Sequence, residues 1–315
     1  MDWVYTAIGL VLLILAGDAL VKGAVNSALR LGVPALIVSL TVVAFGTSAP
    51  ELLISIQSVL DDVPGIAIGN VVGSNIANVL LVLGIPALIA ALHTSECDTR
   101  ASFLQMIGAT ALFIALGAFG VITWVSGVIL LAALAAMLWH AAREVKRHKA
   151  SCAAAPDDEE EVEGADPDMP WAKIIFFLVV GLVGLPLGAN LLVEGASSIA
   201  RHYGVSETVI GLTLVAVGTS LPELATTVMA AIRRQADVAL GNVIGSNMFN
   251  LLGIIGVASF FGDIPVDPQF LKLDFWVMAA AALLLVPFVY LRQDISKIWG
   301  LGLVALYGVY LVVLL

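Results

Sequence analysis

The chain has 315 residues, of which 60% are hydrophobic and 12% are charged, and its mean hydropathy is +1.04. Soluble domains carry about 25% charged residues, and apolar runs of about 18 residues or more are typical of membrane helices. This composition excludes a soluble enzyme and predicts an all-α polytopic membrane protein; the alternating pattern of an outer-membrane barrel is not seen. The net charge of −10 arises largely from eight acidic residues between 157 and 168. We find no basic patch suited to nucleic acid.

Ten apolar stretches follow one another along the chain, and each predicts a membrane span. The first is expected to act as an uncleaved anchor. A basic and then acidic stretch, 143–170, is predicted to be a solvated linker. The predicted spans are 3–27, 34–59, 64–91, 101–119, 121–142, 171–199, 206–232, 237–261, 271–291 and 296–315.

The sequence repeats itself at a fixed offset. GTSAPE at 46–51 returns as GTSLPE at 218–223, an offset of 172 (218 − 46). GNVVGSNIANVLLVLG at 69–84 returns as GNVIGSNMFNLLGIIG at 241–256 with the same offset. We interpret residues 1–142 and 171–315 as two homologous repeats of five spans each.

An odd number of spans per repeat determines the symmetry. After five crossings the second copy enters the membrane from the opposite side, so ten helices form two inverted-topology repeats, a plan typical of secondary transporters. With the N-terminus outside, every Lys and Arg except Arg201 and Lys272 falls on an inner connection. This distribution predicts a multi-pass protein of the plasma (inner) membrane, with the linker 143–170 in the cytoplasm.

The two GTSxPE motifs place carboxylates inside apolar spans. Pro50 and Pro222 lack an N–H, which breaks the helix and frees carbonyl groups, and such breaks are tolerated where they line a cavity. The spacing i, i−3, i−4 and i−7 places four residues of each motif on one face. These sets are Glu51, Ser48, Thr47 and Ala44 in the second span, and Glu223, Ser220, Thr219 and Ala216 in the seventh.

The second pair of motifs adds hydroxyl and amide groups. In the third span Asn78 shares a face with Asn75 and Ser74, and in the eighth Asn250 shares one with Asn247 and Ser246. Inverted symmetry is expected to bring all four segments together at the midplane. Because every ligand is a hard oxygen, the set favours Ca²⁺ or Na⁺ over zinc, copper or iron. A bound cation would also offset the cost of two acids in the bilayer, about 2.5–3.5 kcal/mol each.

Other polar and small residues have simpler interpretations. The GxxxG patterns Gly69/Gly73 and Gly241/Gly245 predict close helix packing. Asp18 and Lys22, four residues apart, predict an interfacial ion pair. Cys97 and Cys152 suggest neither a disulfide framework nor a metal site, so no cofactor is expected.

Together these motifs resemble the cation/Ca²⁺ exchanger superfamily, and within it the prokaryotic sodium/calcium exchangers. The resemblance covers essentially the whole chain and implies an antiporter that exchanges Na⁺ for Ca²⁺ by alternating access, with spans 1 and 6 sliding as a pair. The resemblance also implies a transporter and not an enzyme, and we expect the protein to work as a monomer in the lipid bilayer.

The resemblance also implies a role for each motif residue. Glu51 and Glu223 would bind both ions, with carbonyls of Thr47 and Thr219 at the Ca²⁺ site. Asn78 and Asn250 would complete the centre. The flanking Na⁺ sites would use Ser48, Ser220, Ser74, Ser246 and the carbonyls of Ala44 and Ala216.

Two alternatives remain open at this point. An H⁺/Ca²⁺ antiporter would use the same glutamates as proton carriers, because a desolvated carboxylate can bind either a proton or a cation. A cation channel could also contain acidic residues in its pore, although an internal repeat with broken helices favours alternating access.

Overall fold

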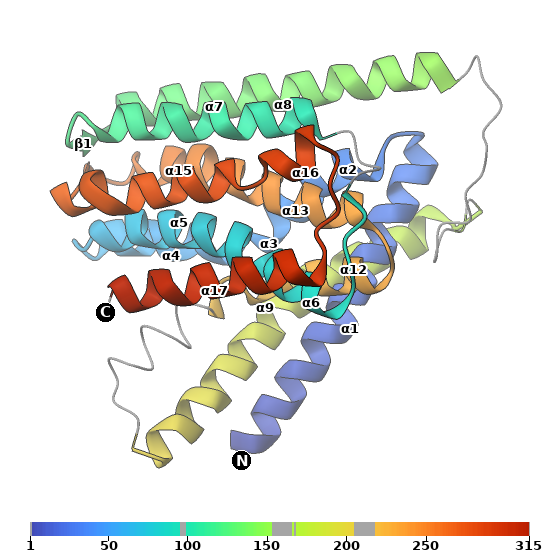
Figure 1. Ribbon diagram of the computed structural model, residues 1–315, viewed down its shortest axis with the longest axis horizontal. Helices are drawn as coiled ribbons and strands as arrows, with labels where there is room; N and C mark the ends of the chain where they lie inside the picture. Colours follow the sequence, from blue (N-terminus) through green and yellow to red (C-terminus); the bar gives the residue numbers. More distant parts are fainter. Residues whose placement is uncertain (1, 95–98, 153–165, 167, 205–217, 315) are drawn as a thin grey trace.

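The computed structural model describes residues 2–94, 99–152, 166, 168–204 and 218–314, and the chain in these ranges is almost entirely helical (Figure 1). Segments with wide π-helical turns are labelled η. In chain order the elements are α1 (Asp2–Leu31), α2 (Ala35–Val38), η1 (Ser39–Val43), α3 (Ala44–Thr47), α4 (Ala49–Leu60), α5 (Gly65–Ala77), η2 (Asn78–Val82), α6 (Gly84–Ile89), α7 (Arg100–Gly117), β1 (Val121–Ile122), α8 (Trp124–Cys152), α9 (Trp171–His202), α12 (Leu221–Ile232), α13 (Ala236–Met248), η5 (Phe249–Ile254), α14 (Ile255–Ala258), β2 (Ile264–Pro265), η6 (Phe270–Asp274), α15 (Phe275–Leu283), α16 (Val286–Tyr290) and α17 (Lys297–Leu314).

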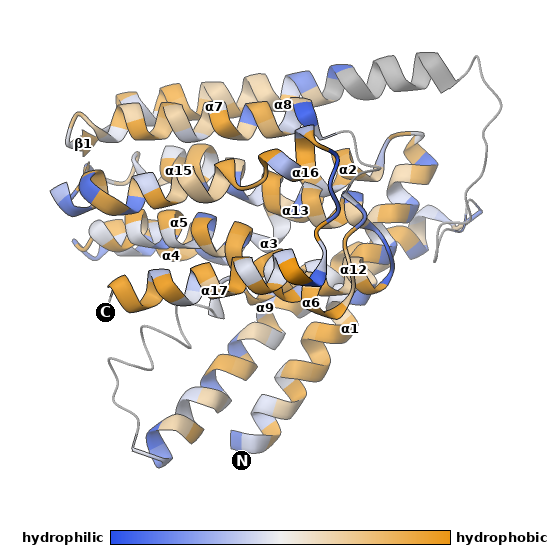
Figure 2. Cartoon of the chain, in the orientation of Figure 1, coloured by the Kyte–Doolittle hydropathy of each residue, from blue (hydrophilic) through white to orange (hydrophobic). Residues whose placement is uncertain are grey.

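The helices have the length and surface of membrane spans. Among the described residues, 7 helices are long and apolar enough to cross a bilayer, and the bent pair Ala35–Thr47 and Ala49–Leu60 makes up to 8. The predicted seventh span is described only from residue 218 onward, and Lys297–Val313 is a shorter apolar helix. Large apolar side chains such as Trp276 and Ile298 are exposed, and Figure 2 shows apolar residues along most helices. The chain is therefore built to face lipid.

The break predicted in the second span is confirmed. Helix α3 ends at Thr47 and α4 starts at Ala49, with a bend of 43° between the two halves. Ser48 leaves the helical conformation at ψ 7°, and Pro50 lies in the first turn of α4. Proline suits this position because the first turn has no use for its missing N–H.

Two helices form the centre of the molecule. Residues Ala236–Ala258 are 94% buried and residues Gly65–Ile89 are 78% buried over their most apolar windows. Both change to a π-helical turn at their signature asparagines, η2 at Asn78 and η5 at Phe249–Asn250. Polar groups on these helices are thus shielded from lipid by the surrounding spans.

Two features differ from the sequence-based expectation. Helix α8 continues to Cys152, so the first part of the predicted linker is helical. A short antiparallel ribbon pairs Val121 with Pro265 and Ile122 with Ile264. We call the end with this ribbon and the C-terminus the ribbon end, and the opposite end, where α8 terminates, the linker end (Figure 1).

Helices α1 and α9 form a pair that slants away from the roughly parallel helices of the bundle (Figure 1). Their backbones approach so closely that side chains would collide. A Cβ on Gly9 would lie 2.5 Å from the amide nitrogen of Leu192, and one on Gly181 would lie 2.5 Å from Cβ of Leu20. Small residues permit this approach, so the two helices pack as one unit.

Candidate ion-binding site

The structure gathers the predicted site residues in the interior. All of them lie among the described residues except Ala216. Thr219 is half-buried, and the others are at most 5% exposed. These buried residues are Ala44, Thr47, Ser48, Glu51, Ser74, Asn78, Ser220, Glu223, Ser246 and Asn250.

The two glutamates occupy equivalent backbone positions. Glu51 lies in the first turn of α4, directly after Ser48 at φ −86° and ψ 7°. Glu223 lies in the first turn of α12, after Ser220 at φ −88° and ψ 5°. A helix N-terminus favours negative charge, so the start of each of these two helices places a carboxylate where the backbone partly stabilises it.

The two motifs are in direct contact. The Ser48 hydroxyl donates to Oε1 of Glu223 at 3.2 Å, and the two carboxylates are electrostatic neighbours. Within the described part of the chain, neither glutamate forms an ion pair with a basic side chain. Two adjacent acids without a basic partner need a cation or protons to be stable in a membrane interior.

An amide network joins the two central helices. Nδ2 of Asn75 donates to the carbonyl of Asn247 at 3.3 Å, and Nδ2 of Asn247 donates to the carbonyl of Asn75 at 3.5 Å. Asn78 donates to Oδ1 of Asn247 at 3.0 Å, and Asn250 donates to Oδ1 of Asn75 at 3.1 Å. Each of these hydrogen bonds has an equivalent in which the two repeats exchange roles. Their effect is to occupy the NH₂ groups of Asn78 and Asn250 and leave the carbonyl oxygens of both free.

Free buried oxygens concentrate at this centre. Most buried polar atoms in proteins have a hydrogen-bond partner, so those without one are informative. In the described chain 8 buried side-chain atoms lack a partner, and all but those of Ser27 and Ser197 belong to predicted site residues. The six atoms at the centre are Oε2 of Glu51, Oε2 of Glu223, Oδ1 of Asn78, Oδ1 of Asn250, Oγ of Ser220 and Oγ of Ser246.

This donor set suits hard cations. Among the described residues, no three or more His, Cys, Asp or Glu side chains come together. The centre instead combines two carboxylates with hydroxyl and amide oxygens, which are the ligands that Ca²⁺ and Na⁺ accept.

Two asparagines that contact the site were not predicted from the sequence. Asn70 donates to the carbonyl of Glu51 at 3.3 Å and to the hydroxyl of Ser55 at 3.2 Å. Asn242 makes the equivalent bonds to the carbonyl of Glu223 at 3.4 Å and to Thr227 at 3.2 Å. The sequence did contain a signal for them, because both are the second residue of the duplicated GNVxGSN motif.

The GxxxG patterns have different surroundings in the two halves. A Cβ on Gly245 would lie 2.5 Å from the carbonyl oxygen of Leu40, and one on Gly241 would lie 2.8 Å from that of Leu36. Close packing is therefore confirmed for α13. A Cβ on Gly73 would have no neighbour within 4 Å, and one on Gly69 would meet only Cζ of Phe270 at 3.8 Å. The close packing predicted for this pair is therefore wrong, and both glycines border a cavity of about 580 Å³ that also reaches Ser74.

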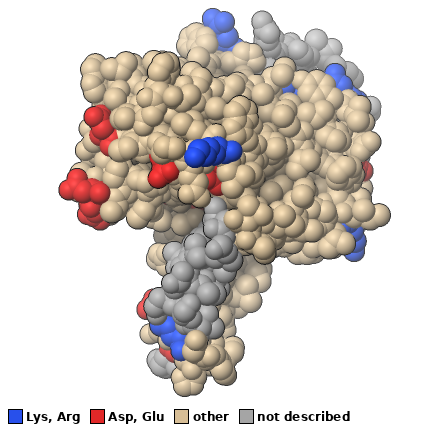
Figure 3. Space-filling view, turned by 60° about the vertical axis from the view of Figure 1, so that its left-hand side comes forward, with Lys and Arg blue, Asp and Glu red and all other residues tan. Residues whose placement is uncertain are grey.

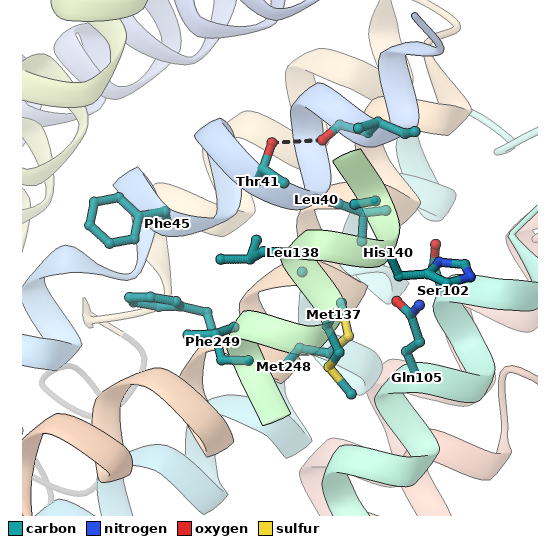
Figure 4. A pocket seen from close by; sticks show the side chains of 14 residues that line it. Leu40, Thr41, Phe45, Ser102, Gln105, Met137, Leu138, His140, Met248 and Phe249 are labelled. Carbon is teal, nitrogen blue, oxygen red and sulfur yellow. Dashed lines mark hydrogen bonds between the residues drawn. The ribbon is translucent and has the colours of Figure 1, made fainter. Parts of the chain in front are cut away.

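A separate cavity of about 170 Å³ lies near the linker end, between α8 and the broken second span (Figure 4). Phe45 and Phe249 lie at one side of it, and Ser102, Gln105 and His140 at the other. The Thr41 hydroxyl already donates to the carbonyl of Ile37 at 2.8 Å. The described residues that line the cavity include no carboxylate.

Together, the apolar helices and the buried oxygen-rich centre define a membrane protein of the transporter class. The sequence profile of the family described as sodium/calcium exchanger protein matches residues 1–142 and 173–315. The chain therefore belongs to the sodium/calcium exchanger family.

Relatives and solved structures agree with this assignment. The sodium/calcium exchanger MaX1 of Methanosarcina acetivorans is 35% identical over 100% of this chain and 98% of its own. The inner membrane protein YrbG of Escherichia coli is 30% identical over 88% of this chain and 85% of its own. A structure of the sodium-calcium exchanger NCX_Mj superposes with a TM-score of 0.83 at 32% identity, covering 100% of this chain and 99% of the other.

Proposed function

We propose that this protein is a Na⁺/Ca²⁺ antiporter that works by alternating access, with both ions bound between Glu51 and Glu223. The observation that carries the proposal is the set of free buried oxygens, which occur as equivalent pairs on the two glutamates and on Asn78 and Asn250. The similarity to the sodium/calcium exchangers MaX1 and NCX_Mj supports it. We assign the chain no enzymatic activity and no cofactor, because the ions are its substrates.

The ligand roles follow from position and free oxygens. Glu51 and Glu223 supply the charge that balances Ca²⁺, and Asn78 and Asn250 supply neutral oxygens beside them. The remaining ligands are hydroxyl or carbonyl oxygens, which suit the lower charge of Na⁺. We place these at Thr47, Thr219, Ser48, Ser220, Ser74, Ser246, Ala44 and Ala216.

We further propose ten crossings arranged as two inverted repeats, 1–142 and 171–315. The exchange-symmetric contacts between Asn75 and Asn247 support this arrangement. So does the pairing of Leu92 with Ile295 at the linker end, which corresponds closely to the ribbon at the other end. We propose that the protein lies in the plasma membrane with its N-terminus outside and residues 143–170 in the cytoplasm. The excess of Lys and Arg on one set of connections supports this orientation. The site is complete within one chain, so a monomer is sufficient.

The direct test is Ca²⁺ uptake into proteoliposomes. Vesicles loaded with Na⁺ are diluted into Na⁺-free buffer with tracer Ca²⁺, with a pH-clamping ionophore present. We expect uptake that requires internal Na⁺ and that falls by about tenfold or more in Glu51→Gln, because affinity for Ca²⁺ depends strongly on the number of charged ligands. Asp263→Asn, an exposed loop acid, is the matched control and should transport normally.

One competing outcome has a structural basis. The free Oε2 atoms of both glutamates could equally carry protons. Uptake that persists without Na⁺ and follows an imposed pH gradient would identify an H⁺/Ca²⁺ antiporter. Ca²⁺ flux unchanged in Glu51→Gln would show that the site itself is wrongly placed.

A further inference from the structure

A charged cluster outside the ion site connects the slanted helix pair to the bundle. The predicted pair Asp18–Lys22 on α1 is confirmed, with Oδ2 and Nζ 2.9 Å apart. Arg233, directly after the end of α12, binds the other carboxylate oxygen of Asp18 through Nε, at 2.5 Å, and through Nη2. The side chains of Asp18 and Arg233 are only 22% and 18% exposed. Such partly buried, hydrogen-bonded charges stabilise a contact more than surface pairs do.

The helices joined by this cluster are in tight contact. A Cβ on Gly17 would lie 3.0 Å from the carbonyl oxygen of Ala225 and 3.2 Å from Cγ of Met229. The space between α1 and α12 at Gly17 is thus too small even for a methyl group. The ion pair lies beside this tight contact, at the linker end of α12.

The repeat offers an internal comparison, because each of these positions has a counterpart at an offset of 172. Asp18, Lys22 and Arg233 correspond to Asn190, Glu194 and Asp61. The second set contains no basic residue, and within the described chain Glu194 forms no ion pair. Asn190, Glu194 and Asp61 therefore cannot form an ion pair with one another like the one that joins α1 to α12.

The packing at the counterpart contact differs accordingly. Ala189 and Leu53, the counterparts of Gly17 and Ala225, border a cavity of about 320 Å³ between α9 and α4. The cavity extends to Thr219 and Pro222, in the second signature motif. The ribbon end is also acidic: exposed Asp61, Asp62, Asp263 and Asp267 lie in its loops, and Figure 3 shows acidic side chains gathered on that face.

From this asymmetry we infer that Asp18, Lys22 and Arg233 form an ionic lock, which holds the linker end closed while the site is open to the ribbon end. Helices α1 and α9 pack as one unit, so a shift of that unit toward α4 would separate α1 from α12 and break the lock. Interface ion pairs that exist in only one of two arrangements bias the equilibrium between them. The inference rests on alternating access in the proposed function.

Thiol labelling tests the lock without measuring transport. In a Cys97→Ser/Cys152→Ser background, Met229→Cys reports on the α1–α12 contact and Leu53→Cys reports on the cavity at α4. The protein is held in lipid nanodiscs and reacted with a water-soluble maleimide. With the lock broken by Arg233→Gln, we expect labelling at Met229→Cys to rise about tenfold and labelling at Leu53→Cys to fall, since hydrogen bonds to charged groups are worth about this factor or more.

The controls separate a lock from general loosening. Arg233→Lys keeps the charge but offers one ammonium in place of two guanidinium contacts, so it should label between the parent and Arg233→Gln. Arg234→Gln removes the neighbouring exposed arginine and should have no effect. Asp18→Asn breaks the same pair from the other helix and should reproduce Arg233→Gln. Unchanged labelling in both lock variants, or faster labelling at both reporters, would overturn the inference. Absence of Na⁺-dependent Ca²⁺ uptake with labelling as expected would refute the proposed function and leave the lock standing.

Discussion

Asn242 illustrates how single residues hold the ion site in shape. Its amide donates to the carbonyl of Glu223 and to Thr227, and its Oδ1 accepts from Thr47 at 3.4 Å. It is fully buried, whereas its counterpart Asn70 is half-buried and borders the cavity of about 580 Å³. Water can replace a lost hydrogen bond only at the second of these positions.

This difference predicts unequal costs for the same substitution. Asn242→Ala should lower the free energy of unfolding by about 1–3 kcal/mol, because buried partners are left unsatisfied. Asn70→Ala should cost less. Thermal unfolding of both variants in the same detergent measures the difference as a shift in Tm. Equal shifts, or a larger shift for Asn70→Ala, would contradict this account of burial.

The sequence predicts the residues that supply free oxygens better than the residues that position them. Glu51 and Glu223 are recognisable because a carboxylate inside an apolar span is costly, and the signature serines because they lie beside them in duplicated motifs. Asn70, Asn242, Asn75 and Asn247 act through partners on other helices, and amide side chains in membrane helices are equally suited to simple packing contacts. Only the three-dimensional pairing distinguishes the two roles.

The break between α3 and α4 is the element on which the geometry of the first motif depends. Pro50 cannot donate a hydrogen bond to the carbonyl of Gly46, and the chain bends by 43° at Ser48. At this bend the Ser48 hydroxyl donates to Glu223 on the other motif.

Pro50→Ala should therefore separate stability from transport. Alanine has the N–H that proline lacks, so it can donate a backbone bond to the carbonyl of Gly46 and favour a continuous helix through Ser48. We expect Tm to stay equal or rise while Na⁺-dependent Ca²⁺ uptake falls by about tenfold, a rough figure for the loss of one well-placed ligand. Pro287→Ala, in α16 away from the site, is the control and should leave uptake unchanged. Normal uptake in Pro50→Ala would show that the bend is not needed to form the site.

Other properties of the elements are invisible in the sequence. The π-helical turns at Asn78 and in Phe249–Ile254 keep ordinary helical dihedral angles at their boundaries and carry no distinctive residue signal. Helix α8 continues to Cys152 through residues that look like a polar linker, because basic and alanine-rich sequence is compatible with an exposed helix. Apolar periodicity predicts where a helix is buried, and not where its exposed end terminates.

At the scale of the whole molecule, the duplication predicts which segments are equivalent, and the structure shows where the equivalence fails. The amide contacts of the central helices are almost unchanged by an exchange of the two repeats. The contacts of α1 with α12 and of α9 with α4 are not, because one pair is closed and the other borders a cavity. The Asp18–Arg233 bond joins residues 215 positions apart, so no local pattern could have revealed it.

The difference between the two ends can be tested by introducing the charges of the ionic lock at the counterpart positions of the ribbon end. The triple variant Asn190→Asp, Glu194→Lys, Asp61→Arg gives the ribbon end the same charges that Asp18, Lys22 and Arg233 give the linker end. Two ion-pair clusters would then compete for the same pair of helices, α1 and α9. The population of each closed arrangement depends on how strongly its own cluster stabilises it. We expect labelling at Leu53→Cys to fall by about tenfold and labelling at Met229→Cys to rise. A factor of this size corresponds to the stabilisation that charged hydrogen bonds provide. Adding Arg233→Gln to the triple variant should strengthen both changes, since only the new lock remains. Labelling at Leu53→Cys that is no slower than in the parent would mean that α9 and α4 do not approach as α1 and α12 do, and that the two ends of the molecule close by different contacts.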